Sequence, residues 1–205
     1  MRVAIALLHY PVLDRQGEIV TTAITNLDLH DIARSAHTFG VQPCYVVHPI
    51  EAQRKLAMRI RDHWVGGSGA RRIPDRSPAM GGLRIVRSLD DAIADFQGAG
   101  AVQLWTTSAK EREGALTFAA ARERVLSGDD DDAVLLVFGT GWGLAPEVEH
   151  RATVRLEPIR SPRADGYNHL SVRAAAAIVF DRLLAPIREP ARPPEHLAFS
   201  KADGC

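Results

Sequence analysis

A buried strand that runs directly into a glycine-rich turn, VLLVFGTGWGL over Val134–Leu144, is the feature that most constrains this fold. The five consecutive apolar residues Val134–Phe138 are typical of a strand that is covered on both faces of a sheet. The glycines that follow let the backbone adopt positive φ and let a ligand lie against the main chain. Pro146 suits the first turn of a helix. Together these signals predict a ligand crevice at the carboxyl end of a parallel sheet.

Segments with strand and helix patterns alternate along the chain. We expect strands at Val3–Leu8, Pro43–Val47, Leu83–Val86, Ala101–Trp105, Val134–Phe138 and Thr153–Leu156. We expect helices at Asn26–Phe39, Pro49–Trp64, Leu89–Phe96, Phe118–Leu126 and Leu170–Leu184. The polar segment His9–Thr25 and the glycine- and proline-rich segment Val65–Gly82 are expected to be loops. This alternation predicts an α/β fold with a mainly parallel six-stranded sheet and helices on both faces.

The chain is expected to form one domain over residues 1–185. Residues 186–205 contain four prolines, at Pro186, Pro190, Pro193 and Pro194, and are expected to form a disordered tail. The two cysteines, Cys44 and Cys205, form neither a disulfide framework nor a metal-binding spacing. No apolar run approaches the length of a membrane span. We therefore expect a cytoplasmic protein without a membrane segment or a metal site.

Charge is unevenly distributed although the formal net charge is zero. The basic window, residues 54–87, contains nine Lys and Arg residues and two Asp residues, a balance of +7. Residues 88–150 carry a balance of −8. Such asymmetry favours a local anionic partner, and RNA affinity comes largely from Lys and Arg on phosphates. The alternative interpretation of Arg54–Arg61 is a solvated helix face that binds no partner. Trp64 fits a core position better than a platform on which a base stacks.

Three segments, taken in order, resemble the motifs of the SPOUT, or α/β-knot, RNA methyltransferases. NLDLHDIARSAHTFGV at Asn26–Val41 is similar to their first motif, a helix with an arginine that ends in Phe-Gly-Val. LLVFGTGWGL at Leu135–Leu144 resembles the second, and the Pro-containing loop and Leu-Ser-Val helix of Glu157–Leu184 resemble the third. The resemblance covers residues 1–185 and is strongest to a stand-alone bacterial branch of the family.

The resemblance implies a C-terminal trefoil knot, a homodimer in which each subunit completes the other's site, and S-adenosylmethionine bound in a bent shape by three loops. Matching places these loops at Thr106–Lys110, Phe138–Leu144 and Glu157–Leu170. The expected cofactor residues are Thr107, Ser108, Phe138, Gly139, Thr140, Gly141, Gly143, Leu144, Ile159, Asn168, His169 and Leu170. Arg34 matches the first-motif arginine, which acts on the acceptor in ribose-methylating members. Asp28 and Tyr167 are the next acceptor-side candidates.

Several positions depart from the family pattern. Asp28 stands where ribose-methylating members commonly carry Asn, and Trp142 occupies the second motif in place of a Glu. His169 falls where the third motif usually has Asn. These departures leave the acceptor atom open between a base nitrogen and a ribose 2′-hydroxyl of tRNA or rRNA. The candidates for a general base that removes the acceptor's proton are His9, Asp28 and Asp165.

Two other functions remain open on the residues alone. Gly139 and Gly141 follow a strand and precede a helix start, and Glu157 lies near the offset of a ribose-binding acid, as in NAD-dependent oxidoreductases of the Rossmann type. Against that interpretation, position 144 is Leu rather than the third glycine, and the turn comes late in the chain. The other alternative is a non-catalytic RNA-binding protein with a methyltransferase fold.

Overall fold

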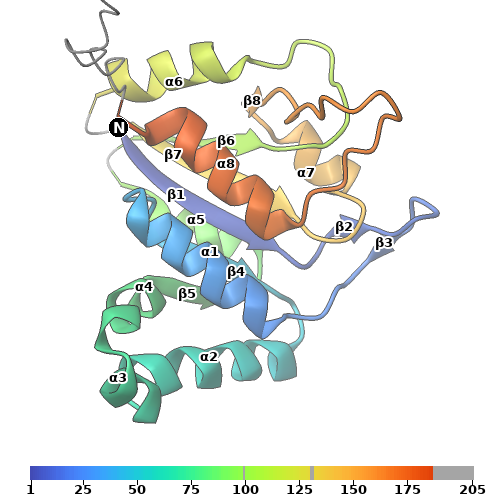
Figure 1. Cartoon of the computed structure of the whole chain (residues 1–205). Coiled ribbons are helices and arrows are strands. Elements are labelled where there is room, and N and C mark those ends of the chain that lie inside the picture. Colours follow the sequence, from blue (N-terminus) through green and yellow to red (C-terminus); the bar gives the residue numbers. More distant parts are fainter. Residues whose placement is uncertain (99, 130–131, 187–205) are drawn as a thin grey trace, which may run out of the picture.

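Six parallel strands form the centre of the molecule in the computed structural model, which describes residues 1–98, 100–129 and 132–186 (Figure 1). In spatial order they are β5 (Leu83–Val86), β4 (Cys44–Val47), β1 (Arg2–Leu8), β7 (Ala133–Gly139), β6 (Val102–Thr106) and β8 (Val154–Arg155). Every neighbouring pair in this sheet is parallel. The predicted six-stranded α/β sheet is therefore confirmed.

The two central strands, β1 and β7, pair along their whole length, from Arg2 opposite Ala133 to Leu8 opposite Gly139. All residues of Val3–Leu8 and Ala133–Phe138 are buried. A strand covered on both faces can be apolar at every position, which explains why both segments are continuous apolar runs rather than alternating ones. Their carboxyl ends meet at the glycine-rich turn.

Helices cover both faces of the sheet, as predicted. One face carries α1 (Asn26–Thr38), α6 (Phe118–Ser127) and α8 (Val172–Leu184), whose buried residues pack with Val3, Ile5 and Leu7. The other face carries α5 (Leu89–Phe96) and α7 (Pro146–His150), which pack with Ala4, Ala6 and Leu8. Odd and even residues of β1 thus face different cores, as the strand period of two requires.

The prediction of a loop at Val65–Gly82 is wrong. Helix α2 (Glu51–Val65) is followed by α3 (Ser68–Arg72), the 3-10 turn η1 (Pro74–Arg76) and α4 (Ser77–Gly81). The prolines occupy first-turn positions, where the missing N–H is not needed, so they begin short helices instead of breaking them. Gly67 is required by packing, because a Cβ there would lie 2.7 Å from the His63 carbonyl oxygen.

A small hairpin interrupts the segment His9–Thr25, where the sequence predicts a loop. Its strands, β2 (Val12–Leu13) and β3 (Ile19–Val20), pair antiparallel. On its other side, β2 bridges from Val12 to Leu144 in the glycine-rich turn. This contact spans most of the chain, and no local pattern in the sequence reveals it.

Two expectations concern the C-terminal part of the chain. The predicted tail, residues 186–205, lies outside the described residues except for residue 186. The trefoil knot stays a prediction. Within the ranges that the structure describes, no helix combines the length and the apolarity needed to span a bilayer.

We expect Phe180→Ala to lower the free energy of unfolding by about 3–5 kcal/mol, because truncating a buried aromatic ring leaves a cavity. Phe180 is fully buried, and its ring centroid lies 6.2 Å from that of Phe138 and 6.3 Å from that of Phe39. Urea denaturation followed by circular dichroism measures the change. The control is Leu126→Ala on α6, where the side chain is 61% exposed and a change within about 0.5 kcal/mol is expected. Equal losses in the two variants would contradict this account of the core.

Candidate functional site

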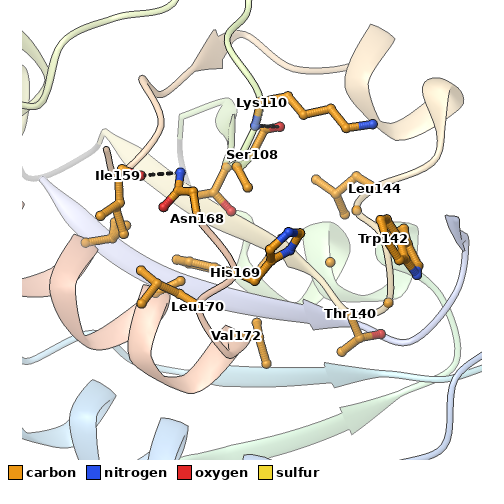
Figure 2. Close-up of a pocket in the computed structure, with 18 of the residues that line it drawn as sticks. Ser108, Lys110, Thr140, Trp142, Leu144, Ile159, Asn168, His169, Leu170 and Val172 are labelled. Atoms are coloured by element: carbon orange, nitrogen blue, oxygen red, sulfur yellow. Dashed lines mark hydrogen bonds between the residues drawn. The ribbon is translucent and has the colours of Figure 1, made fainter. Parts of the chain in front are cut away.

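A cavity of about 760 Å³ lies at the carboxyl ends of β6, β7 and β8 (Figure 2). Its walls come from the segments that follow these three strands and from the first turns of α8. Because parallel strands end at the same edge of a sheet, loops far apart in the sequence meet there. The volume falls within the range of about 300–1,000 Å³ that is common for small-molecule sites.

The twelve residues predicted to bind the cofactor all line this one cavity. They are Thr107, Ser108, Phe138, Gly139, Thr140, Gly141, Gly143, Leu144, Ile159, Asn168, His169 and Leu170. Of the three acceptor-side candidates, Asp28 lines the cavity as well, whereas Arg34 and Tyr167 do not. Arg34 is exposed on α1, and Tyr167 lies beside His169 with a centroid separation of 5.2 Å. The structure thus brings the predicted set together, and its role in binding stays a prediction.

Each glycine of the turn after β7 meets a different steric requirement. A Cβ at Gly139 would lie 2.9 Å from the Leu144 amide nitrogen, so the turn closes too tightly for a side chain. Gly141 has φ +62°, and a Cβ there would lie 2.8 Å from the Leu13 carbonyl oxygen. Gly143 has φ +116°, and its Cβ position opens onto free space. Since Gly143 also lines the cavity, a ligand can approach its main chain directly.

Main-chain hydrogen bonds from the N-terminal hairpin hold this turn. The Leu13 amide donates to the Gly143 carbonyl at 2.9 Å, and the Trp142 amide donates back to the Leu13 carbonyl at 2.9 Å. The Thr140 amide donates to the Leu8 carbonyl at 3.1 Å. The hairpin therefore sets the shape of the cavity wall, although the sequence pattern predicts no element there.

A partly buried hydrogen-bond chain links the turn to His9. The Thr140 hydroxyl donates to the Leu8 carbonyl at 3.1 Å, so its oxygen accepts from the Thr22 hydroxyl. The Thr22 hydroxyl oxygen in turn accepts from His9 Nδ1 at 3.0 Å. These partners assign the proton of His9 to Nδ1 and leave its Nε2 as a bare acceptor. Among the described residues that Nε2 has no hydrogen-bond partner.

A second buried histidine, His48, packs beside His9 with a centroid separation of 5.7 Å. The Ile50 amide donates to His48 Nδ1 at 3.1 Å, and His48 Nε2 donates to the Thr22 carbonyl at 3.0 Å. Burial, followed by the neighbouring His48, lowers the pKa of His9 to about 4, and Asp28 opposes the shift only in part. His9 is therefore neutral near pH 7. It also does not line the cavity. This arrangement fits a positioning role and not that of the general base.

Asp28 is the one general-base candidate in the cavity lining. Its carboxylate accepts from Arg173 Nη1 at 2.8 Å and from the Thr25 hydroxyl at 2.6 Å, and it is 7% exposed. The ion pair with Arg173 joins the start of α1 to the start of α8. Asp165 is exposed outside the lining, and hydrogen bonds from the Arg163 guanidinium hold the pKa of Asp165 below its ordinary value.

The loop before α8 is closed by a side chain. Asn168 Nδ2 donates to the Ile159 carbonyl at 2.8 Å, which joins the two ends of the loop at one side of the cavity (Figure 2). The helix itself is capped by Ser171, whose hydroxyl accepts from the Ala174 amide at 3.3 Å. Asn168 therefore closes the loop, and Ser171 caps the helix.

Other lining residues were missed by the sequence analysis. They include Leu13, Arg112, Glu149 and Val172. Glu149 accepts from the Thr106 hydroxyl at 3.2 Å inside the cavity wall. Glu157 also lines the cavity, and one of its carboxylate oxygens accepts from the Phe118 amide at 2.7 Å. The helix pattern that begins near residue 170 signals Val172, whereas Leu13 and Glu149 reach the cavity only through tertiary contacts.

Several cations of the basic window have protein partners. Arg54 donates to the His48 carbonyl, Lys55 pairs with Glu51, and the Arg76 guanidinium lies 4.8 Å from the Trp64 ring centroid. Trp64 itself packs against the core, so it fits the core position expected for it. Arg59, Arg71 and Arg72 are exposed and form no ion pair with any described residue.

Comparisons with known proteins agree with this geometry. Residues 2–185 match the family model described as SAM-dependent RNA methyltransferase. An uncharacterized protein of Aquifex aeolicus is 37% identical over 185 residues, which cover 89% of this chain and 88% of that protein. A tRNA (guanine-N(1)-)-methyltransferase of Nitratidesulfovibrio vulgaris is 44% identical over 180 residues. That match covers 87% of this chain but only 41% of the relative, so the chain spans less than half of that protein.

A solved structure shows the same fold. The probable methyltransferase from Bordetella pertussis Tohama I superimposes with a TM-score of 0.59 at 16% sequence identity. The alignment covers 89% of this chain and 92% of that one. The six-stranded sheet with its surrounding helices is therefore shared over nearly the whole of both chains.

We expect His9 to make the protein less stable in acid. The unfolded state takes up a proton near the ordinary pKa of 6.5, whereas folded His9 resists protonation until about pH 4. Its contribution to stability is therefore complete above pH 6.5 and is lost as the pH falls toward 4. From about pH 8 to about pH 5 the loss from His9 amounts to about 2 kcal/mol.

Urea unfolding of His9→Asn at both pH values checks this, because Asn keeps a side-chain N–H donor near the Nδ1 position and does not titrate. The variant should lose less stability on acidification than the wild type. Leu126→Ala on the exposed face of α6 removes no titratable group, so it is the control and should keep the wild-type pH dependence. An identical pH dependence in wild type and His9→Asn would contradict the assignment.

Proposed function

Because the chain belongs to the family of SAM-dependent RNA methyltransferases, we propose that it transfers the methyl group of S-adenosylmethionine to an RNA. The observation that supports this most is the convergence of all twelve predicted cofactor residues on one cavity. When bound, S-adenosylmethionine supplies a methyl group that is already activated by its sulfonium. The task left to the protein is to align that methyl group with a nucleophile at near-attack distance.

The residues of the cavity fit this cofactor. Leu144, Ile159 and Leu170 offer apolar side chains for an adenine ring, and Gly143 leaves its main chain open to a ligand. Two carboxylates, Asp28 and Glu149, also line the cavity, and each is paired with an arginine, Asp28 with Arg173 at 2.8 Å and Glu149 with Arg155 at 3.8 Å. A pocket that is mainly apolar with a few convergent polar groups is usual for a cofactor of this size.

On the acceptor side we propose Asp28 as the group that receives the acceptor's proton. It is buried, lines the cavity and is oriented by Arg173 and Thr25. Arg34 lies outside the cavity of its own chain, so a role on the acceptor requires the homodimer that the family resemblance implies. In that homodimer one subunit completes the site of the other. The trefoil knot and a cytoplasmic location are further parts of this proposal.

The acceptor RNA is proposed to be a tRNA or an rRNA, with tRNA tested first because a curated relative is named a tRNA methyltransferase. The chain matches 41% of that relative, so the guanine N1 position in its name is one of the acceptor atoms to be tested. A ribose 2′-hydroxyl is the other. The basic window is the proposed surface for the RNA backbone, through Arg59, Arg71 and Arg72.

We expect the purified protein to incorporate label from tritiated S-adenosylmethionine into bacterial tRNA or rRNA.

We expect Asn168→Ala to weaken binding of S-adenosylmethionine by about tenfold, because the loss of one hydrogen bond loosens the loop before α8, which lines the cavity. Isothermal titration calorimetry measures the affinity. The matched control is Arg163→Ala, an exposed change in the same loop outside the lining.

Two outcomes would overturn the proposed function. Stabilisation by NAD(H) and not by S-adenosylmethionine in a thermal-shift comparison would favour a nucleotide oxidoreductase, since a ligand at about 100 times its Kd adds about 2.7 kcal/mol to stability. RNA binding without methyl incorporation would favour a non-catalytic RNA-binding protein. Mapping the labelled nucleotide then separates a base nitrogen from a ribose oxygen.

For the basic window, we expect the double variant Arg71→Glu and Arg72→Glu to weaken RNA binding and flatten its salt dependence. For every phosphate that an arginine no longer neutralises, the slope of log K against log salt should fall by about 0.7–0.9. Fluorescence anisotropy over a range of salt concentrations measures the slope. Arg124→Glu, an exposed change on α6, is the control and should leave the slope unchanged. An unaltered slope in the double variant would remove this surface from the proposal.

A further inference from the structure

Three aromatic side chains form a row at the mouth of the cavity, which we call the aromatic row: Trp142, His169 and Tyr167. Trp142 comes from the glycine-rich turn, and the other two come from the loop before α8. The ring centroids of Trp142 and His169 are 6.3 Å apart, and those of His169 and Tyr167 are 5.2 Å apart. The two contacts are edge-on, with interplanar angles of 70° and 64°. The row is therefore one continuous aromatic surface built from two loops.

The ends of the aromatic row are open to solvent. Trp142 is 52% exposed and Tyr167 is 60% exposed, although large aromatic residues are usually well buried. Trp142 and His169 also line the cavity, so the row continues from the cavity wall onto the surface. A contiguous exposed aromatic surface of this kind at the rim of a pocket marks an interaction site.

Two cations lie in the same cavity lining. Lys110 and Arg112, in the loop after β6, form no ion pair with any residue that the structure describes. The Lys110 amide donates to the Ser108 hydroxyl at 3.0 Å, which holds this part of the loop at the cavity. Figure 2 shows Lys110, His169 and Trp142 placed around the one cavity.

The chemistry of this rim fits a nucleotide better than a protein surface. Aromatic rings stack on any unpaired base, and Lys and Arg side chains bind phosphates. A protein partner that covered the same rim would bury both cations, which is costly unless carboxylates pair with them. A phosphate group satisfies both cations, and a base covers the exposed rings.

We propose that the aromatic row is the platform on which the base of the acceptor nucleotide stacks outside its helix, with Lys110 and Arg112 on the adjoining phosphates. This inference rests on the proposed function and names its substrate class, an RNA whose acceptor nucleotide is unpaired or flipped out. It follows that a nucleotide in a loop is a substrate, whereas the same nucleotide in a stable duplex is a poor one, since extrusion from the stack costs free energy.

The test compares Trp142→Ala with Trp142→Phe on an RNA that the wild type methylates. Loss of a base-stacking ring should lower kcat/KM by about 5- to 150-fold in Trp142→Ala. Trp142→Phe keeps a ring and should recover most of the loss. Because Trp142 also lines the cofactor cavity, the affinity for S-adenosylmethionine is measured in parallel, and the loss of kcat/KM should exceed any loss of that affinity. Leu27→Ala, a 61% exposed side chain on α1, is the matched control.

A direct readout uses 2-aminopurine at the acceptor position of a single-stranded RNA. Stacking on Trp142 should quench its fluorescence in the wild type, and Trp142→Ala should abolish the quenching. Unchanged kcat/KM and unchanged quenching in Trp142→Ala would overturn the inference while the methyltransferase function stands.

If the wild type methylates no RNA, the proposed function fails, and the quenching measurement still decides whether the aromatic row binds a base. Sedimentation velocity covers the remaining case: dissociation of a dimer by Trp142→Ala would make the row a subunit interface and overturn the inference.

Discussion

The pairing of β1 with β7 is the constraint on which the site depends. Their registers match from Arg2 opposite Ala133 to Leu8 opposite Gly139, so both strands end at the same level. The Thr140 hydroxyl can then donate to the Leu8 carbonyl across 132 residues of sequence. The same alignment lets the hydrogen-bond chain through Thr22 connect Thr140 to His9. A shift by one residue would exchange the side chains that face the two different cores and would disrupt the packing of both, so packing on both faces fixes the geometry of the turn.

Apolar runs and helix periodicity were sufficient to predict the elements around this pair, because strands and helices of a buried α/β sheet carry strong local patterns. The order of the strands is not a local property. The convergence of the loops after β6, β7 and β8 follows from the adjacency of those strands, and the family resemblance, not periodicity, predicted it. The same resemblance predicted Asp28, which lines the cavity, and Arg34, which lies outside the cavity of its own chain.

The errors have two physical origins. In Val65–Gly82 the glycines and prolines predict breaks in helical structure, but Pro74 and Pro78 begin helical turns, and the glycines allow close packing on α2. In His9–Thr25 most residues are polar, and Val12 is fully buried, while main-chain bonds to Gly143 that no side-chain pattern encodes join the hairpin to the turn. A two-residue strand with one buried side chain, held by tertiary main-chain hydrogen bonds, gives a prediction based on hydrophobic pattern little signal to use.

The zero net charge of the chain conceals a separation of charge within the site itself. Buried Asp28 and Glu149 lie in the wall of the cavity, whereas the cations Lys110 and Arg112 come from the loop after β6. Each carboxylate is paired with an arginine, Asp28 with Arg173 and Glu149 with Arg155, whereas neither loop cation has an ion-pair partner among the described residues. The unpaired cations favour an anionic ligand at this loop, such as an RNA phosphate. An RNA held there would lie beside a sulfonium cofactor in the same cavity, and methyl transfer requires that the two reactants occupy adjoining and not overlapping positions.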